Sequence, residues 1–173
     1  MCKKNYPYQA FYCEENIWQL AKQRNESDGE VWFIINPQNT VATAMQQAAE
    51  DQGFVVWDYH VIYYSPSHGI YDLDTLCSFP CLPTHYLQES FANLAPYLEK
   101  EYAPYFRVIT AVDYLKDFSS DRKHMLDEAG KYHASPPPWS TIGEGNTLSL
   151  YYDFNHKQLG EIFSLDEIME RFS

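Results

Sequence analysis

Two apolar runs joined by a short polar turn limit most tightly how this chain can fold. The run VVWDYHVIYY, at residues 55–64, is rich in β-branched and aromatic side chains, which favours a β-strand. The turn residues SPSHG follow, and the second run, IYDLDTL, begins at Ile70. Two strands joined by such a turn form an antiparallel hairpin. The chain is therefore expected to build around a largely antiparallel sheet.

The predicted hairpin brings a histidine close to two aspartates. Side chains alternate across a strand, so Asp72 and Asp74 share one face of the second strand. With the turn centred near Pro66 and Ser67, antiparallel pairing places His60 opposite one of these aspartates, with the other on the diagonal. A carboxylate there can orient the imidazole and raise its basicity, as the acidic member of a catalytic triad does. We therefore predict a His–Asp pair, provided that the register holds.

A third candidate side chain lies at the start of a predicted helix. Apolar residues recur at helical spacing between Glu14 and Gln23, with acidic residues in the first turn and basic residues in the last. Cys13 directly precedes this segment. At such a position the helix dipole stabilises a thiolate, and a neighbouring imidazolium lowers the pKa of the cysteine further. Cys13, His60 and an aspartate thus form a candidate Cys-His-Asp triad, with a buried structural cysteine as the alternative.

Composition narrows the class of protein and its partners. At 173 residues the chain is expected to form one domain, residues 1–173. Its 24 acidic and 12 basic residues give a net charge of −12, which disfavours nucleic acid and favours cationic ligands such as a free amino terminus. We expect no membrane segment, no signal peptide and four free thiols, which together indicate a cytoplasmic protein. Nothing in the sequence demands more than a monomer.

The remaining periodic segments predict a mixture of helices and strands. We expect strands at residues 31–36, 106–112 and 148–154, a helix from residue 84 to Pro96, and a last helix at 164–172. A short helix or turn is expected at 43–51 and a long polar loop at 119–146. The predicted fold class is α+β, with helices packed on a mixed, largely antiparallel central sheet.

Two further groups of polar residues have a simpler interpretation than chemistry. Cys77, Cys81 and His85 have a spacing that suggests zinc, but two prolines interrupt the run and no fourth ligand stands out, so we expect no metal. In SDRKHM, at 120–125, a local salt bridge closing the loop is expected among Asp121, Arg122 and His124. Glu14 is expected to be a surface charge that compensates the helix dipole, with a role in substrate binding as the alternative because it lies beside Cys13.

Taken together, these motifs resemble one protein family. YCEENIW (12–18), WDYHV (57–61), YDLDT (71–75), FPC (79–81), FRVI (106–109), SDRKHM (120–125) and PPP (136–138) occur in the order found in the protein N-terminal glutamine amidohydrolase family. The resemblance implies an α-β-α sandwich related to papain and transglutaminase. It also implies an enzyme without a cofactor that converts the N-terminal glutamine of proteins or peptides to glutamate and ammonia, as a step of the N-degron pathway. The nucleophile, histidine and aspartate of the family fall on Cys13, His60 and Asp72.

For substrate binding, the sequence offers candidates and leaves alternatives open. A free amino terminus calls for a carboxylate, for which Glu15 and Asp74 are our candidates. Trp57 and Tyr59 are candidate pocket walls, with core packing as the alternative because a regular strand would place them opposite His60. A second interpretation directs the same triad at internal amides, as in a protease, a protein deamidase or a transglutaminase. A third is a non-enzymatic module that binds N-terminal residues.

Overall fold

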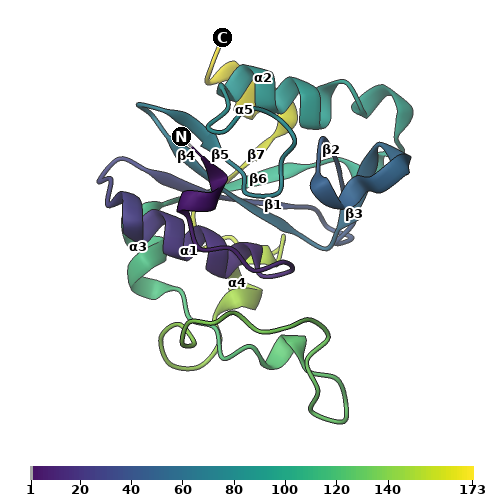
Figure 1. The fold of residues 1–173 in the computed structure, drawn as a ribbon. Helices are drawn as coiled ribbons and strands as arrows, with labels where there is room; N and C mark the ends of the chain where they lie inside the picture. The colour runs from purple at the N-terminus through teal and green to yellow at the C-terminus, as the bar shows by residue number, and fades with distance from the viewer. Residues whose placement is uncertain (1) are drawn as a thin grey trace.

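A five-stranded sheet forms the centre of the protein (Figure 1), which we describe from a computed structural model covering residues 2–173, apart from the side chains of residues 50–52. The strand order is β5-β4-β1-β6-β7, and each of these pairings is antiparallel. A second, two-stranded sheet pairs β2 with β3. The bounds are β1 Glu30–Ile35, β2 Val41–Ala44, β3 Phe54–Trp57, β4 His60–Ser65, β5 Gly69–Tyr71, β6 Tyr105–Thr110 and β7 Glu161–Ser164.

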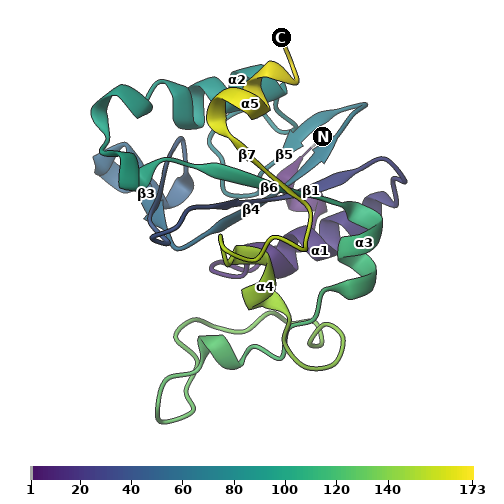
Figure 2. The ribbon, with the colours of Figure 1, turned by 180° about the vertical axis from the view of Figure 1, so that it is seen from behind.

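Helices cover both faces of the central sheet, as the two opposite views show (Figures 1 and 2). The helices α1 (Cys13–Arg24), α3 (Ala111–Asp117) and α4 (Leu148–Tyr152) lie on one face, and α2 (Pro83–Leu87) and α5 (Leu165–Glu170) lie on the other. The π-helix η3 (Gln88–Ala92) continues α2. Short 3-10 helices are η1 Lys3–Asn5, η2 Gln47–Gln52, η4 Ala95–Tyr97, η5 Lys100–Tyr102 and η6 Lys123–Met125. Within residues 2–173, none of the helices has the length and apolar character needed to cross a bilayer.

Alternation along β1 explains why the sheet has two covered faces. Val31, Phe33 and Ile35 belong to the buried cluster under α1, α3 and α4, while Trp32 and Ile34 belong to the cluster under α2 and α5. Both neighbours of β1 are strands, so this central strand is buried on each side. A strand buried on both faces is expected to be continuously apolar, as EVWFII nearly is. The sheet therefore forms the middle of three layers.

The predicted hairpin is present, but the first predicted strand is two strands. β4 and β5 pair around Ser65 and Gly69, close to the expected register. The expected single strand at 55–64 is wrong, because the chain leaves the pairing between Trp57 and His60. β3 pairs with β2, whereas β4 pairs with β1 and β5. This break changes which residues share a face with His60.

Other expectations at the level of elements have mixed outcomes. The α+β class with a largely antiparallel sheet is confirmed, although the described strand pairings include none of the parallel pairs expected for a mixed sheet. The strand expected at 148–154 is wrong, since this segment contains the helix α4. The last helix is confirmed, and Ser164 and Glu167 form the capping box at its start.

Candidate active site

Cys13 lies at the first position of α1, where the helix meets the central sheet. The helix packs against β4, and the backbone N–H of Val61 donates to the sulfur of Cys13. The side chain is partly exposed, while Tyr12 before it is fully buried. Because Val61 follows His60 directly, this contact brings the thiol to the end of β4 that begins with the histidine.

His60 and Asp72 form the buried pair that the hairpin predicted. Nε2 of His60 lies 3.0 Å from Oδ1 of Asp72, and the two side chains are 2% and 0% exposed. Burial disfavours the imidazolium, but the charge of Asp72 and this hydrogen bond outweigh burial and raise the pKa of His60. Because Nε2 is hydrogen-bonded to Asp72, Nδ1 is the ring nitrogen that can exchange a proton with another group.

Asp72 is held as a carboxylate by four hydrogen bonds. Besides His60, the backbone N–H of Asp74 donates to Oδ1 at 2.9 Å. Nε2 of Gln46 and the hydroxyl of Tyr86 donate to Oδ2 at 2.8 and 2.9 Å. Burial alone would favour the neutral acid, yet His60 and these donors lower the pKa of Asp72 to about 2. Gln46 and Tyr86 were not found from the sequence, because no local pattern indicates that either side chain reaches Asp72.

Trp57 lies on the same side as His60, against the expectation from a regular strand. Its ring stacks on the imidazole at 5.5 Å between centroids, with an angle of 14° between the planes. The break between β3 and β4 turns Trp57 back onto the histidine. Tyr59 instead stacks on Tyr152 at 5.1 Å, and its hydroxyl donates to Glu14. Trp57 thus helps to fix the plane of the imidazole.

The expected lowering of the Cys13 pKa is wrong for the unliganded site. Burial raises the pKa of Cys13 well above its usual value, and the negative charges of Glu14 and Asp74 raise it further. The hydrogen bond from Val61 opposes them but is weaker. These groups therefore favour the thiol of Cys13 over its thiolate.

Glu14 is buried rather than a surface charge, which corrects the expectation from the sequence. Its side chain is fully buried, with Oε2 3.6 Å from the sulfur of Cys13 and 3.1 Å from the hydroxyl of Tyr59. Oε1 has no hydrogen-bond partner among the described residues, and Nε2 of His124 lies 3.6 Å away. A buried carboxylate oxygen without a donor is rare and needs an explanation.

Glu15 is fully engaged by the loop that follows α3. Nε and Nη2 of Arg122 donate to its two oxygens at 2.9 and 2.8 Å, and Nε1 of Trp139 donates at 2.8 Å. The local salt bridge expected among Asp121, Arg122 and His124 is therefore wrong: Arg122 pairs with Glu15, and Asp121 pairs with Lys123 at 3.0 Å. The structure thus uses the carboxylate of Glu15 to hold a loop 107 residues away.

Asp74 lies beside the His60–Asp72 pair and is partly exposed. Ligand atoms of His60, Asp72 and Asp74 all lie within 4.8 Å of one another. The hydroxyl of Tyr8 donates to Oδ1 of Asp74 at 2.5 Å. Burial, and after it the charge of Asp72, raises the pKa of Asp74 despite the opposing charge of His60. Of the two predicted carboxylates, Asp74 is the one near the histidine.

Comparison with known proteins identifies the family. A family model described as N-terminal glutamine amidase matches residues 8–172. A human protein N-terminal glutamine amidohydrolase is 37% identical, covering 95% of this chain and 87% of its own length. The corresponding proteins of Bos taurus and Danio rerio are 37% and 34% identical, over 96% and 95% of this chain and 86% and 88% of their own lengths. The chain belongs to the N-terminal glutamine amidase family. Its candidate active-site residues all lie within the matched range, so the family resemblance covers the whole site.

Proposed function

We propose that this protein hydrolyses the side-chain amide of an N-terminal glutamine in proteins or peptides, giving glutamate and ammonia. The proposal rests on the buried His60–Asp72 pair and on Cys13, whose sulfur accepts a hydrogen bond from Val61, the residue after His60, in a chain of the N-terminal glutamine amidase family. The relatives bear the name of this activity. A cysteine at the start of a helix that packs on the strand bearing the histidine, within three layers, also supports kinship with papain and transglutaminase.

In the first half of the proposed reaction, Cys13 attacks the γ-carboxamide carbon of the substrate. Nδ1 of His60 accepts the thiol proton, and Asp72 stabilises the imidazolium through Nε2. Backbone N–H groups in the first turn of α1 have no partner within the helix and are our candidates to bind the oxyanion. His60 then returns the proton to the leaving nitrogen, so that ammonia departs and a γ-thioester remains.

In the second half, water hydrolyses the thioester. His60 removes a proton from the water, the hydroxide adds to the thioester carbon, and the C–S bond breaks. The proton returns to the sulfur of Cys13, and the product is an N-terminal glutamate. Asp72, held by Gln46 and Tyr86, keeps the imidazole in one orientation through both halves.

Recognition of a free amino terminus is assigned to Glu14 and Asp74. Oε2 of Glu14 lies 3.6 Å from the sulfur of Cys13, and the charge of Asp74 also acts on this sulfur. Among the residues that the structure describes, Oε1 of Glu14 has no hydrogen-bond donor, whereas Glu15 already has three donor contacts. An ammonium group supplies the missing donor and charge, and a blocked amino terminus leaves the buried carboxylate unpaired.

This assignment couples substrate binding to activation of the nucleophile. In the free protein, Glu14 and Asp74 disfavour the thiolate of Cys13. An ammonium group beside these carboxylates offsets that repulsion and favours the thiolate. The enzyme would then bind peptides with a blocked amino terminus weakly and would also fail to activate its cysteine against them.

Ammonia release from four matched peptides tests the proposal. The peptides carry N-terminal Gln, N-acetyl-Gln, N-terminal Asn, or Gln at an internal position, and each is offered to the wild type and to Cys13→Ala. We expect release from the free N-terminal Gln alone, and none with the variant. Release from the acetylated or internal Gln would assign the protein to the deamidases of internal residues. Binding of N-terminal Gln without any release would indicate a recognition module.

A further inference from the structure

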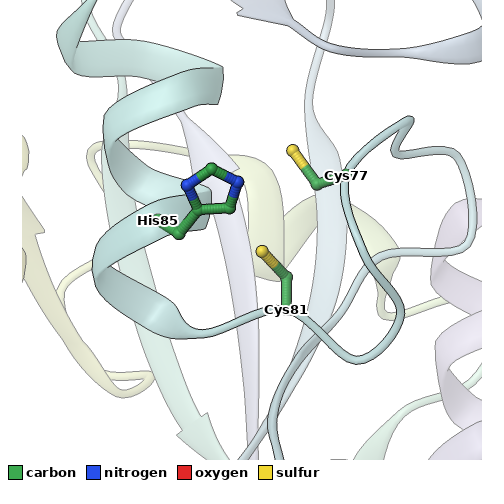
Figure 3. Close-up of side chains that lie close together, drawn as sticks. All are labelled: Cys77, Cys81 and His85. Carbon is green, nitrogen blue, oxygen red and sulfur yellow. The ribbon is translucent and has the colours of Figure 1, made fainter.

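Two cysteines and a histidine outside the proposed catalytic site converge on one point (Figure 3). The sulfur atoms of Cys77 and Cys81 and a ring nitrogen of His85 lie within 4.8 Å of one another. The three side chains come from different segments: the loop after Asp72, the bridge to β5, and the first turn of α2. The prolines that argued against a site from the sequence do not keep these side chains apart.

We propose that Cys77, Cys81 and His85 bind a zinc ion, with water as the fourth ligand. In a tetrahedral zinc site with Zn–S near 2.3 Å and Zn–N near 2.1 Å, ligand atoms lie about 3.6–3.8 Å apart. The observed limit of 4.8 Å exceeds that spacing by only about 1 Å, which rotation of side chains can close. Thiolate and imidazole ligands also select zinc over cations such as magnesium, which prefer oxygen ligands.

The backbone already holds the three ligands in place. Cys81 exchanges two backbone hydrogen bonds with Ile70, at 2.7 and 2.8 Å. The backbone N–H of Cys77 donates to Oγ1 of Thr75 at 3.1 Å. Little backbone ordering is therefore needed when the metal binds, which favours binding by lowering its entropic cost.

Burial and charge are also compatible with a zinc ion. Cys81 is buried, Cys77 is partly buried and His85 is exposed, so water can reach the fourth position from the side of the histidine. When Zn²⁺ binds, both thiol protons leave to the solvent, and two thiolates cancel the charge of the ion. The ammonium of Lys3 interacts with Cys77, so its charge opposes the binding of a cation there.

The site would connect the aspartate of the candidate triad to α2. Cys77 lies five residues after Asp72, and His85 precedes Tyr86, whose hydroxyl donates to Asp72. A metal bound to both the loop and the helix would fix the positions of both partners in this hydrogen bond, Asp72 and Tyr86. The inference concerns a structural metal and does not depend on the proposed reaction.

Cobalt binding to the reduced full-length protein tests the site. Titration with Co²⁺ should produce a thiolate-to-cobalt charge-transfer band and the intense visible bands of tetrahedral cobalt, and Zn²⁺ should abolish both. His85→Ala should weaken binding at least about tenfold, and Cys77→Ser should also reduce the charge-transfer band by about half. Cys13→Ala and His68→Ala serve as matched controls, because they remove a thiol and an exposed imidazole elsewhere, and both should bind as the wild type does.

Three results would overturn the proposal. These are the absence of a charge-transfer band in the wild type, loss of the band in Cys13→Ala, and its full retention in both Cys77→Ser and His85→Ala. Circular dichroism of each variant shows whether it is folded. His85 is exposed, so His85→Ala keeps the test decisive if a cysteine variant fails to fold. A rise in melting temperature with Zn²⁺ for the wild type, but not for His85→Ala, is expected as an independent result.

Discussion

At the scale of residues, the candidate site is a set of charges whose balance depends on the substrate. Asp72 raises the pKa of His60, whereas burial and the charges of Glu14 and Asp74 raise the pKa of Cys13. A cationic amino terminus beside Glu14 and Asp74 offsets the repulsion that these two charges exert on a Cys13 thiolate. Of the two predictions at this scale, the first tests the role of His60 and the second tests the pKa of Cys13.

Asp72→Asn should reduce kcat/KM about 10³-fold or more, because the imidazolium loses its stabilising charge and its orientation. The pH dependence should change as well. In the wild type, the raised pKa of His60 places the acid limb of kcat/KM above pH 6.5, since one proton must leave the Cys13–His60 pair before attack. In the variant, burial dominates and lowers the pKa of His60, so the acid limb should move to lower pH. A limb that stays in place would contradict the assigned role.

Glu14→Gln should lower the pKa of Cys13, because one of the charges that oppose the thiolate disappears. The measurement is the pH dependence of alkylation by the neutral reagent iodoacetamide, whose midpoint should move to lower pH. For a peptide with a free N-terminal Gln, kcat/KM should fall about 10–100-fold, through loss of the contact with the ammonium group. Glu128→Gln removes an exposed carboxylate and serves as the control. If the alkylation midpoint falls but kcat/KM for the peptide is unchanged, Glu14 does not bind the amino terminus of the substrate.

At the scale of elements, the site depends on connections between segments far apart in the chain. The Glu15–Arg122 pair fastens the loop after α3 to the first turn of α1, and it is almost completely buried. Removing one partner of a buried pair leaves the other charge without compensation. The start of α1, and with it Cys13, is therefore held partly by this loop.

Arg122→Ala should lower the free energy of unfolding by about 3 kcal/mol, because it leaves the carboxylate of Glu15 buried without its cation. Chemical denaturation measures this loss. Limited proteolysis should also show faster cleavage within residues 123–140. Lys123→Ala, which breaks only the exposed pair with Asp121, should change stability by less than about 0.5 kcal/mol. Equal effects of the two variants would show that the buried pair has no special structural role.

The sequence predicted local elements well and their junctions poorly. The hairpin and the His60–Asp72 contact follow from alternation and a turn, which are local features. The break between β3 and β4 depends on pairing with β2, a partner that the sequence pattern did not reveal. The segment at 148–154 has aromatic residues typical of strands, yet it packs as a helix against β1. Tertiary contacts override propensity in such short segments.

Among the site residues, those in motifs were predictable and those that support them were not. Cys13, His60 and Asp72 stand in recognisable runs of sequence. The burial of Glu14 and the engagement of Glu15 by Arg122 depend on a loop more than 100 residues away. Charge at a helix start is usually solvated, so local reasoning placed Glu14 at the surface. Tertiary contacts, rather than the local sequence pattern, therefore determine which of the two adjacent glutamates, Glu14 or Glu15, is available to bind a ligand.

At the scale of the whole molecule, the buried His60–Asp72 pair links stability to pH. The pKa of Asp72 is lowered from 3.8 to about 2, so its contribution is present above pH 3.8 and is lost as pH falls towards 2. The pKa of His60 is raised, so its contribution is present below pH 6.5 and is lost as pH rises through its folded value. The pair therefore stabilises the fold most in the mildly acidic range.

Urea denaturation of the wild type and Asp72→Asn across this range tests the linkage. At mildly acidic pH the wild type should be more stable, with about 2 kcal/mol of its advantage arising from the shift of Asp72. This difference should shrink as pH falls from 4 towards 2, because Asp72 becomes protonated in both the folded and the unfolded state. A difference that stays constant with pH would mean that packing around residue 72, rather than its charge, stabilises the protein.

The central claim is that Cys13 forms a thioester with the side chain of an N-terminal glutamine. Acid quenching during turnover, followed by mass spectrometry of the digested protein, tests it most directly. We predict an adduct with the mass of the peptide minus ammonia on the fragment that contains Cys13, and neither adduct nor ammonia with Cys13→Ala. An adduct on another cysteine, or ammonia release that persists in Cys13→Ala, would contradict the account.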